Sequence, residues 1–168
     1  MTQSRNLTWR VGASLSDFEA TREIARELHL AGHFGHVPFS EKKRDDLAEV
    51  GLREPDLFAT ILCEQVPHDG TSPKVVGLSM LGIEDYLLAE DLTLCTIYAF
   101  GVSASLSPML RGKAALGLWK ASRAWSRMKG ASEMMVAVTN GLDIDSTFWR
   151  RAGASFVGNN FSIKLTAS

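Results

Sequence analysis

The stretch SPMLRGKAALGLWKA occupies residues 107–121 and joins a predicted strand to a predicted basic helix. Residues 92–102 are rich in β-branched and aromatic side chains, which favours a strand, and from about 108 to 129 the apolar residues recur with the period of a helix. A strand that enters a helix through a turn points free backbone N–H groups and the positive end of the helix dipole at one place. Such a place suits a phosphate or pyrophosphate group.

Two interpretations of this junction are open from its own residues. In the first, Gly112 lets a phosphorylated ligand approach the backbone closely, while Arg111 and Lys113 add charge and side-chain donors. In the second, the residues form an ordinary helix start, with Ser107 as the N-cap and Pro108 at the first helical position. The choice between them depends on the rest of the chain.

The formal net charge of −1 hides a strong asymmetry along the chain. Residues 1–104 carry 9 basic and 16 acidic side chains, or −7, whereas residues 105–168 carry 9 basic and 3 acidic ones, or +6. The near-neutral total excludes strong general attraction to nucleic acid or to an anionic membrane. The basic helix is therefore either a solvated face or a local site for a phosphorylated ligand. Its apolar face is expected to hold Ala114, Leu118, Ala121, Trp125 and Met128.

Length and composition indicate one globular domain over residues 1–168. The 45% hydrophobic and 22% charged residues exclude a disordered chain, and a core of this size needs no disulfide or metal. No apolar run reaches the roughly 18 residues of a membrane span, and the polar start is not that of a signal peptide. Cys63 and Cys95 lie in apolar runs, so we expect reduced core residues of a cytoplasmic protein. No spacing typical of a metal site occurs.

The order of the predicted elements indicates an α+β fold whose mixed, mostly antiparallel sheet is flanked by helices. Only the strands over 92–102 and 132–139 are joined by a helical crossover. Gly101 predicts a bulge or a close backbone approach. In chain order the elements are strand 7–13, helix 17–31 capped by Ser16 or Asp17, helix 40–51 closed by Gly51, strands 57–66, 75–86 and 92–102, helix 108–129 closed by Gly130, strand 132–139, helix 145–152 closed by Gly153, and two strands around the turn 158–160.

This order of elements, with P-x-x-R-G-K at Pro108 to Lys113, resembles the GCN5-related N-acetyltransferase (GNAT) superfamily. The superfamily motif P-x-x-R-G-x-G-x-G/A cradles the pyrophosphate of acetyl-coenzyme A. The ending TFWRRAGASFVG (147–158) is similar to the superfamily's F-Y-x-K-x-G-F, and ELHLAGHFGHVPF (27–39) is similar to a subgroup found in phage and prophage genomes. The resemblance covers nearly the whole chain. It implies a GNAT-like fold and transfer of an acetyl group from acetyl-coenzyme A to a primary amine.

The resemblance also implies where acetyl-coenzyme A binds, between the strands 92–106 and 132–139 with its diphosphate on residues 111–116. The second and third glycines of the motif are replaced by Ala114 and Leu116, and the tyrosine that often protonates the leaving thiolate is replaced by Trp149. The cofactor-binding residues carried over are Ala104, Ser105, Leu106, Arg111, Gly112, Lys113, Ala114, Ala115, Leu116 and Asn140.

In this superfamily the amine attacks the thioester directly, so catalysis needs orientation and a hydrogen bond to the oxyanion, here from a strand N–H near 104–106. The candidates for the group that accepts the amine's proton are Tyr98 and Glu64. Tyr98 can instead be a core aromatic, and Glu64 a solvated carboxylate at a strand end. His33 and His36 lie in the loop that overhangs the acceptor site in the resembled fold, although loop histidines are mostly surface residues.

A function from another class is open as well: a non-catalytic GNAT-fold binding or structural protein, associated with a phage virion and its proteins. Leu116 and Trp149 favour this alternative. Binding of nucleic acid through the basic helix is the weakest hypothesis, because no aromatic side chain interleaves with the charges. For the enzyme, the acceptor is a small-molecule or protein amine in the cytoplasm, and homodimers are common in the family.

Overall fold

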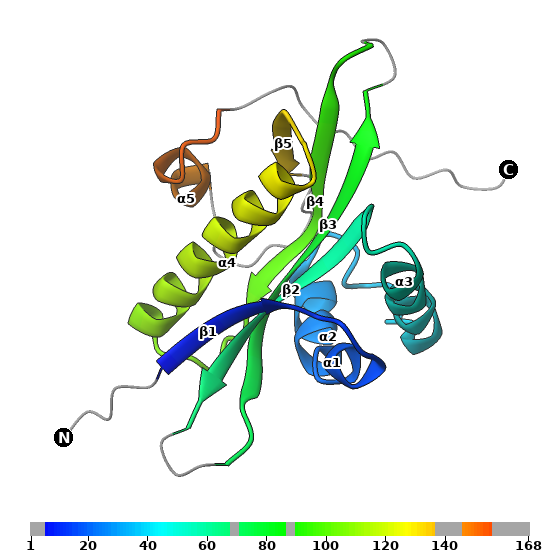
Figure 1. The fold of residues 1–168 in the computed structure, drawn as a ribbon. Helices are drawn as coiled ribbons and strands as arrows, with labels where there is room; N and C mark the ends of the chain where they lie inside the picture. The colour runs from blue at the N-terminus through cyan, green and yellow to red at the C-terminus, as the bar shows by residue number, and fades with distance from the viewer. Residues whose placement is uncertain (1–5, 68–70, 87–89, 137–145, 156–168) are drawn as a thin grey trace, which may run out of the picture.

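The computed structural model describes residues 6–67, 71–86, 90–136 and 146–155 of the chain (Figure 1). Within them, one five-stranded sheet has the spatial order β1-β2-β3-β4-β5. The strands are β1 (Asn6–Val11), β2 (Phe58–Val66), β3 (Lys74–Asp85), β4 (Thr93–Val102) and β5 (Glu133–Val136). The first three neighbouring pairs are antiparallel, and β4 pairs with β5 in parallel. The predicted α+β class with a mixed, mostly antiparallel sheet is confirmed.

Helices cover both faces of this sheet (Figure 1). On one face lie α1 (Leu15–Glu19), α2 (Arg22–Ala31) and α3 (Glu41–Arg53), and on the other lie α4 (Pro108–Met128) and α5 (Ser146–Arg151). The predicted crossover is confirmed, since α4 connects the parallel strands β4 and β5. A hydrophobic core lies on each face of the sheet, because successive residues of a strand point to opposite faces. Ile61 faces α4, whereas its neighbour Leu62 faces α2.

The helix expected over 17–31 is two helices, and its predicted cap was wrong. Ser14 caps α1, because its hydroxyl accepts the Asp17 N–H at 3.2 Å. Asp17 itself is engaged elsewhere, accepting the Ala13 N–H at 2.8 Å. The break falls at Thr21, whose hydroxyl donates to the Phe18 carbonyl at 2.6 Å and ends the first helix before α2 begins.

The other helix ends follow the sequence signals more closely. Ser40 caps α3 as predicted, but Gly51 does not end it, since the helix continues to Arg53. Gly130 and Gly153 follow α4 and α5 with φ of 81° and 89°, a backbone region that favours glycine and ends a helix. The face of α4 differs in one place: Met128 is 71% exposed. The final two predicted strands, and residues 137–139 of the strand before them, lie outside the described residues.

The strand β4 contains a bulge, three residues before the predicted one. Met80 pairs with Ala99 and Leu81 pairs with Ile97, so Tyr98 is the extra residue. The bulge reverses the alternation of β4, because Ile97 and Phe100 both enter the core under α4 although three positions separate them.

Gly101 provides the predicted close backbone approach instead. A Cβ placed there would lie 2.0 Å from Cδ2 of Leu28, so α2 packs directly on the β4 backbone. Cys63 and Cys95 are free and buried, as expected, and burial raises the pKa of the Cys63 thiol to about 12. Within the described ranges, none of the helices is long and apolar enough to cross a membrane.

Candidate functional site

The site lies at the bulge of β4. The parallel pairing with β5 is described from Leu94 opposite Glu133 to Ile97 opposite Val136, and residues 137–145 lie outside the described part of the chain. The next residue of β4 is Tyr98, the bulged one, and β4 continues beyond it to Val102. The bulge therefore lies in the middle of β4, directly after its described pairing with β5.

Tyr98 presents its ring on the α2 face of the sheet, and it is not the core aromatic that one prediction allowed. It is 49% exposed. The ring lies over Gly82, where a Cβ would come within 2.7 Å of Cε2 of Tyr98. Partial burial, with a smaller contribution from the Glu84 carboxylate, raises the pKa of the phenol, so Tyr98 is protonated at neutral pH.

A cavity of about 390 Å³ opens beside Tyr98, within the size range of small-molecule sites. It lies between α2, the segment that follows it, α3 and the strands β3 and β4. Its apolar wall includes Leu28, Val37, Phe39, Leu47, Met80 and Ala99. Its polar lining consists of His29, Ser40, Lys43, Arg44 and Tyr98. We call this cavity the α2–α3 pocket.

His29 is the histidine that the fold brings to this pocket, and the sequence analysis missed it. Its Nε2 lies 2.6 Å from the carbonyl oxygen of Val37. A carbonyl only accepts hydrogen bonds, so Nε2 carries the proton and Nδ1 is the basic nitrogen of the neutral ring. The loop histidines that were considered, His33 and His36, are exposed and do not line the pocket. The available signal was the position of His29 directly after Leu28 on the buried side of its helix.

Glu64 lies elsewhere and is occupied. Its carboxylate accepts hydrogen bonds from Nε and Nη2 of Arg10, the latter at 2.7 Å. It is 9% exposed, so it is not the solvated strand end that was the alternative. Along β3, Glu64 pairs with Val75, whereas Tyr98 lies beyond Met80, which puts the two about 17 Å apart at the usual strand rise. The structure therefore does not bring the two catalytic candidates into one site.

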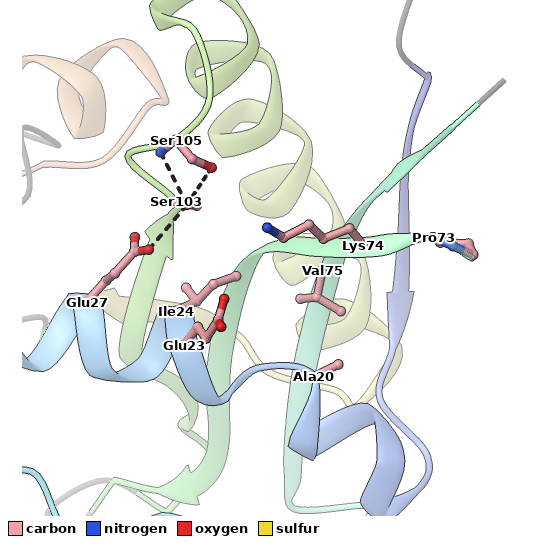
Figure 2. Close-up of a pocket in the computed structure, with 9 residues that line it drawn as sticks. All are labelled: Ala20, Glu23, Ile24, Glu27, Pro73, Lys74, Val75, Ser103 and Ser105. Atoms are coloured by element: carbon pink, nitrogen blue, oxygen red, sulfur yellow. Dashed lines mark hydrogen bonds between the residues drawn. The ribbon is translucent and has the colours of Figure 1, made fainter. Parts of the chain in front are cut away.

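The loop between β4 and α4 is partly engaged by a carboxylate from α2. The Glu27 carboxylate accepts a hydrogen bond from the Ala104 N–H at 3.3 Å. It also accepts one from the Ser103 hydroxyl at 3.4 Å, and the Ser103 hydroxyl lies 3.0 Å from the Ser105 hydroxyl (Figure 2). Glu27 and both serines line a second cavity, of about 490 Å³, together with Glu23. The Ala104 N–H, one of the donors predicted for an oxyanion, thus already has an acceptor.

The predicted phosphate cradle needs correction because α4 begins early. The helix starts at Pro108, and the Arg111 N–H donates to the Ser107 carbonyl at 2.9 Å. Throughout the predicted segment 111–116, each backbone N–H donates to a carbonyl four residues earlier in the chain. The N–H groups that the helix leaves free are those of Met109 and Leu110, in its first turn.

Burial separates the predicted cofactor residues into two groups. Leu106, Ala114 and Ala115 are core residues with at most 7% exposure, so their side chains cannot contact a ligand. The others that the structure describes are at least partly exposed: Ala104, Ser105, Arg111, Gly112, Lys113 and Leu116. Asn140 lies outside the described residues.

The remaining residues suit a diphosphate at the first turn of α4. Arg111 and Lys113 form no ion pair with another described residue, and a Cβ at Gly112 would meet nothing within 4 Å. Two unpaired cations, two free N–H groups and an open glycine therefore lie within one and a half helical turns. The site offers fewer free backbone N–H groups than the motif predicts, but free N–H groups and cations at a helix N-terminus suit an anion.

Trp149 of α5 does not supply a replacement acid. Its ring packs edge-on against Phe100 and Trp119, with centroids 5.1 and 5.4 Å away. Trp119 in turn donates from its indole nitrogen to the Ala152 carbonyl at 3.1 Å. Through these contacts α5 packs against α4 and β4.

Comparison with known proteins shows the fold. No family model and no curated protein sequence matches the chain. A probable acetyltransferase matches with TM-score 0.68 and 12% identity over 97% of this chain and 99% of the other. An acetyltransferase of Trypanosoma brucei matches with TM-score 0.63 and 20% identity, covering 95% and 100%. The aminoglycoside N-acetyltransferase AAC(6')-Iy in complex with CoA matches with TM-score 0.68 and 18% identity, covering 99% of both chains. The chain thus has the fold of the GNAT acetyltransferases.

Proposed function

We propose that this protein transfers an acetyl group from acetyl-coenzyme A to a primary amine of a small molecule, by direct attack in a ternary complex. The observation that carries the proposal is the coincidence of two features at Tyr98: the bulge of β4 and the α2–α3 pocket. Solved structures with this fold include an aminoglycoside acetyltransferase with CoA and one with sisomicin, which supports a small-molecule amine as acceptor.

Acetyl-coenzyme A would be held at two places. Its diphosphate would bind the first turn of α4, where Arg111 and Lys113 supply charge and the N–H groups of Met109 and Leu110 are free. From there its acetyl end would extend toward Tyr98 on β4. What it supplies when bound is a thioester with a readily displaced thiolate, since a free thiol has a pKa of about 8.5.

The residues of the chain would orient and deprotonate the amine. The apolar wall of the α2–α3 pocket excludes water and fixes the acceptor, and a β4 N–H beyond Ile97 would stabilise the oxyanion. His29 lines the same pocket, and its Nδ1, the ring nitrogen that does not bind the Val37 carbonyl, would take the proton of the attacking amine. The Tyr98 hydroxyl would donate a hydrogen bond at the reacting end. Glu64 has no place in this scheme, because Arg10 holds it in an ion pair.

Calorimetric titration of acetyl-coenzyme A tests the binding half of the proposal. Gly112→Asp puts a negative charge beside the proposed diphosphate, meets no protein atom within 4 Å, and is compatible with the N-terminal part of a helix. The matched control is Ala124→Asp, an exposed site about 18 Å further along α4 with the same change of charge. We expect micromolar binding to the wild type and the control, and at least tenfold weaker binding to Gly112→Asp.

The absence of any heat or thermal shift with the folded wild type at millimolar acetyl-coenzyme A would refute the proposal. The non-catalytic binding protein would then be the better interpretation of the fold. That such a protein associates with a virion stays a prediction, and so does the homodimer. No structural neighbour described above points to a phage protein.

A further inference from the structure

We infer that the acceptor in the α2–α3 pocket is an apolar amine that also carries a carboxylate, such as an aromatic amino acid, and not a polycation. The inference rests on the proposed function and adds the chemical class of the acceptor. It is carried by the charge and the polarity of the pocket lining.

The pocket wall selects an apolar body. Leu28 is 5% exposed and forms the floor with Met80 and Ala99, while Phe39 and Leu47 close the sides from the segment before α3 and from α3. A polyhydroxylated or polyamine chain would lose its hydration against these side chains without gaining hydrogen bonds. A ring or branched apolar group would be favoured there.

The rim of the pocket on α3 offers an unpaired cation. Lys43 lies in the first turn of α3 and is exposed, and among the described residues its ammonium has no ion-pair partner. Its neighbour in the lining, Arg44, is already bound: the guanidinium donates to the Phe18 carbonyl at 2.6 Å and pairs with Asp45. Lys43 is therefore the group available to bind the anionic end of an acceptor.

The same lining repels a polycation. In the described part of the chain, no Asp or Glu side chain lines this pocket. The nearby carboxylates of α3 are neutralised by other partners: Glu41 by Arg22 and Arg26, and Asp46 by Lys42 at 2.7 Å. An acceptor with several ammonium groups would thus meet the unpaired Lys43, and no carboxylate of the lining would bind those groups.

The polar and apolar parts of the lining give the acceptor a direction. Tyr98 and His29 line the pocket from β4 and α2, and Lys43 lines it from α3. In an α-amino acid the amine and the carboxylate share one carbon, so the amine would face Tyr98 and His29 while the carboxylate beside it binds Lys43. These polar contacts at one end, with the apolar side chain against the wall, would fix a single orientation of the acceptor for attack.

Three amines separate this inference from its alternatives. Phenylalanine has the ring, the amine and the carboxylate, phenethylamine lacks the carboxylate, and spermidine is a polycation. Each is titrated calorimetrically into the wild type, with and without saturating coenzyme A, and each is tested for acetylation by the release of free thiol from acetyl-coenzyme A. We expect phenylalanine to bind at least threefold more tightly than phenethylamine, and spermidine to bind least.

Lys43→Gln is the test variant and Lys42→Gln its matched control. Lys42 is the preceding residue, is exposed, and pairs with Asp46 outside the pocket. Phenylalanine should bind about three- to fivefold more weakly to Lys43→Gln, a range set by a partly solvated ion pair, with phenethylamine unchanged and Lys42→Gln like the wild type.

The outcomes of binding and turnover are distinguishable. A preference for phenylalanine that depends on Lys43, without thiol release, supports the acceptor class and refutes the transferase. Thiol release with spermidine preferred, or with phenylalanine binding unaffected by Lys43→Gln, keeps the transferase and overturns this inference.

Discussion

Gly101 of β4 lies so close to Leu28 of α2 that a Cβ at position 101 would be 2.0 Å from Cδ2 of the leucine. Leu28 is buried in one cluster with Leu62 and Leu78. The contact sets the distance between α2 and the sheet. It therefore also sets the position of His29, the next residue, which lines the α2–α3 pocket.

The first prediction concerns this contact. Gly101→Ala should lower the free energy of unfolding by about 1–3 kcal/mol, because the added methyl group overlaps Leu28 and forces its side chain or the β4 backbone to shift. Gly112→Ala is the control, and it should leave stability unchanged or raise it by about 0.5–1 kcal/mol, since nothing lies within 4 Å of its Cβ and alanine favours a helix. Urea denaturation followed by circular dichroism measures both. Equal midpoints for the two variants would contradict the packing described here.

Much of the fold could be predicted because its signals are local. The apolar runs over 57–66 and 75–86 indicated the strands β2 and β3, and the change of period after residue 107 indicated α4. A helix between two apolar strands then implied the one parallel pair. Gly130 and Gly153 marked helix ends through a backbone preference that belongs to glycine itself.

The bulge at Tyr98 could not be predicted in the same way. Helices pack on both faces of β4, so the run TLCTIYAFGV has apolar residues on both faces and shows no strict apolar–polar alternation whose interruption could be seen. The register is set by long-range packing, with Ile97 and Phe100 against α4 and Gly101 against Leu28. The bulge decides where the pocket opens, so this part of the site needed the structure.

The phosphate motif shows two sequence arguments in conflict. Periodicity assigned Ala114 to the apolar face of the helix, while the motif assigned it to the ligand. The structure places it at 0% exposure, in favour of periodicity. A pattern of residue types carries a function only where the backbone leaves its N–H groups free, and here α4 starts at Pro108, before the motif's glycine positions.

The second prediction concerns the pH dependence of stability. Arg10 pairs with Asp17 at 2.6 Å, and this hydrogen bond holds the pKa of the Asp17 carboxyl well below its usual range. A carboxyl with a depressed folded-state pKa stabilises the protein above its unfolded pKa of about 3.9 and loses this effect as the pH falls further. Asp17→Asn should therefore lower the urea midpoint clearly at pH 7 and by less at pH 3.

The control for this prediction is Asp46→Asn. Asp46 pairs with Lys42 on the surface of α3, where an ion pair contributes little. Its midpoint should stay near that of the wild type at both pH values. An Asp17→Asn deficit that is the same at pH 3 as at pH 7 would mean that the lost contribution is packing or hydrogen bonding rather than charge.

The third prediction concerns Glu27, whose carboxylate binds the loop between β4 and α4. Glu27 accepts the Ala104 N–H, and it lies near the loop that leads into the proposed diphosphate site. Removing a negative charge beside this loop should tighten binding of acetyl-coenzyme A by about two- to fivefold at low salt. Glu27→Gln tests this in the calorimeter, and Glu23→Gln is the control, because Glu23 lines the same cavity without a hydrogen bond to the loop. A loss of affinity in Glu27→Gln would instead assign Glu27 a role in shaping the loop.

The last prediction concerns the proposed base. His29→Gln keeps an N–H that can reach the Val37 carbonyl but removes the basic nitrogen of the ring. With phenylalanine as the acceptor, kcat at pH 7 should fall by about 10²-fold, with KM for acetyl-coenzyme A unchanged. The readout that separates a base from a structural residue is the pH profile: the variant should recover towards wild-type rates at high pH, where the free amine is abundant. A variant that is slower by the same factor at every pH, or that unfolds at a lower urea concentration, would show that His29 only holds the Val37 segment in place.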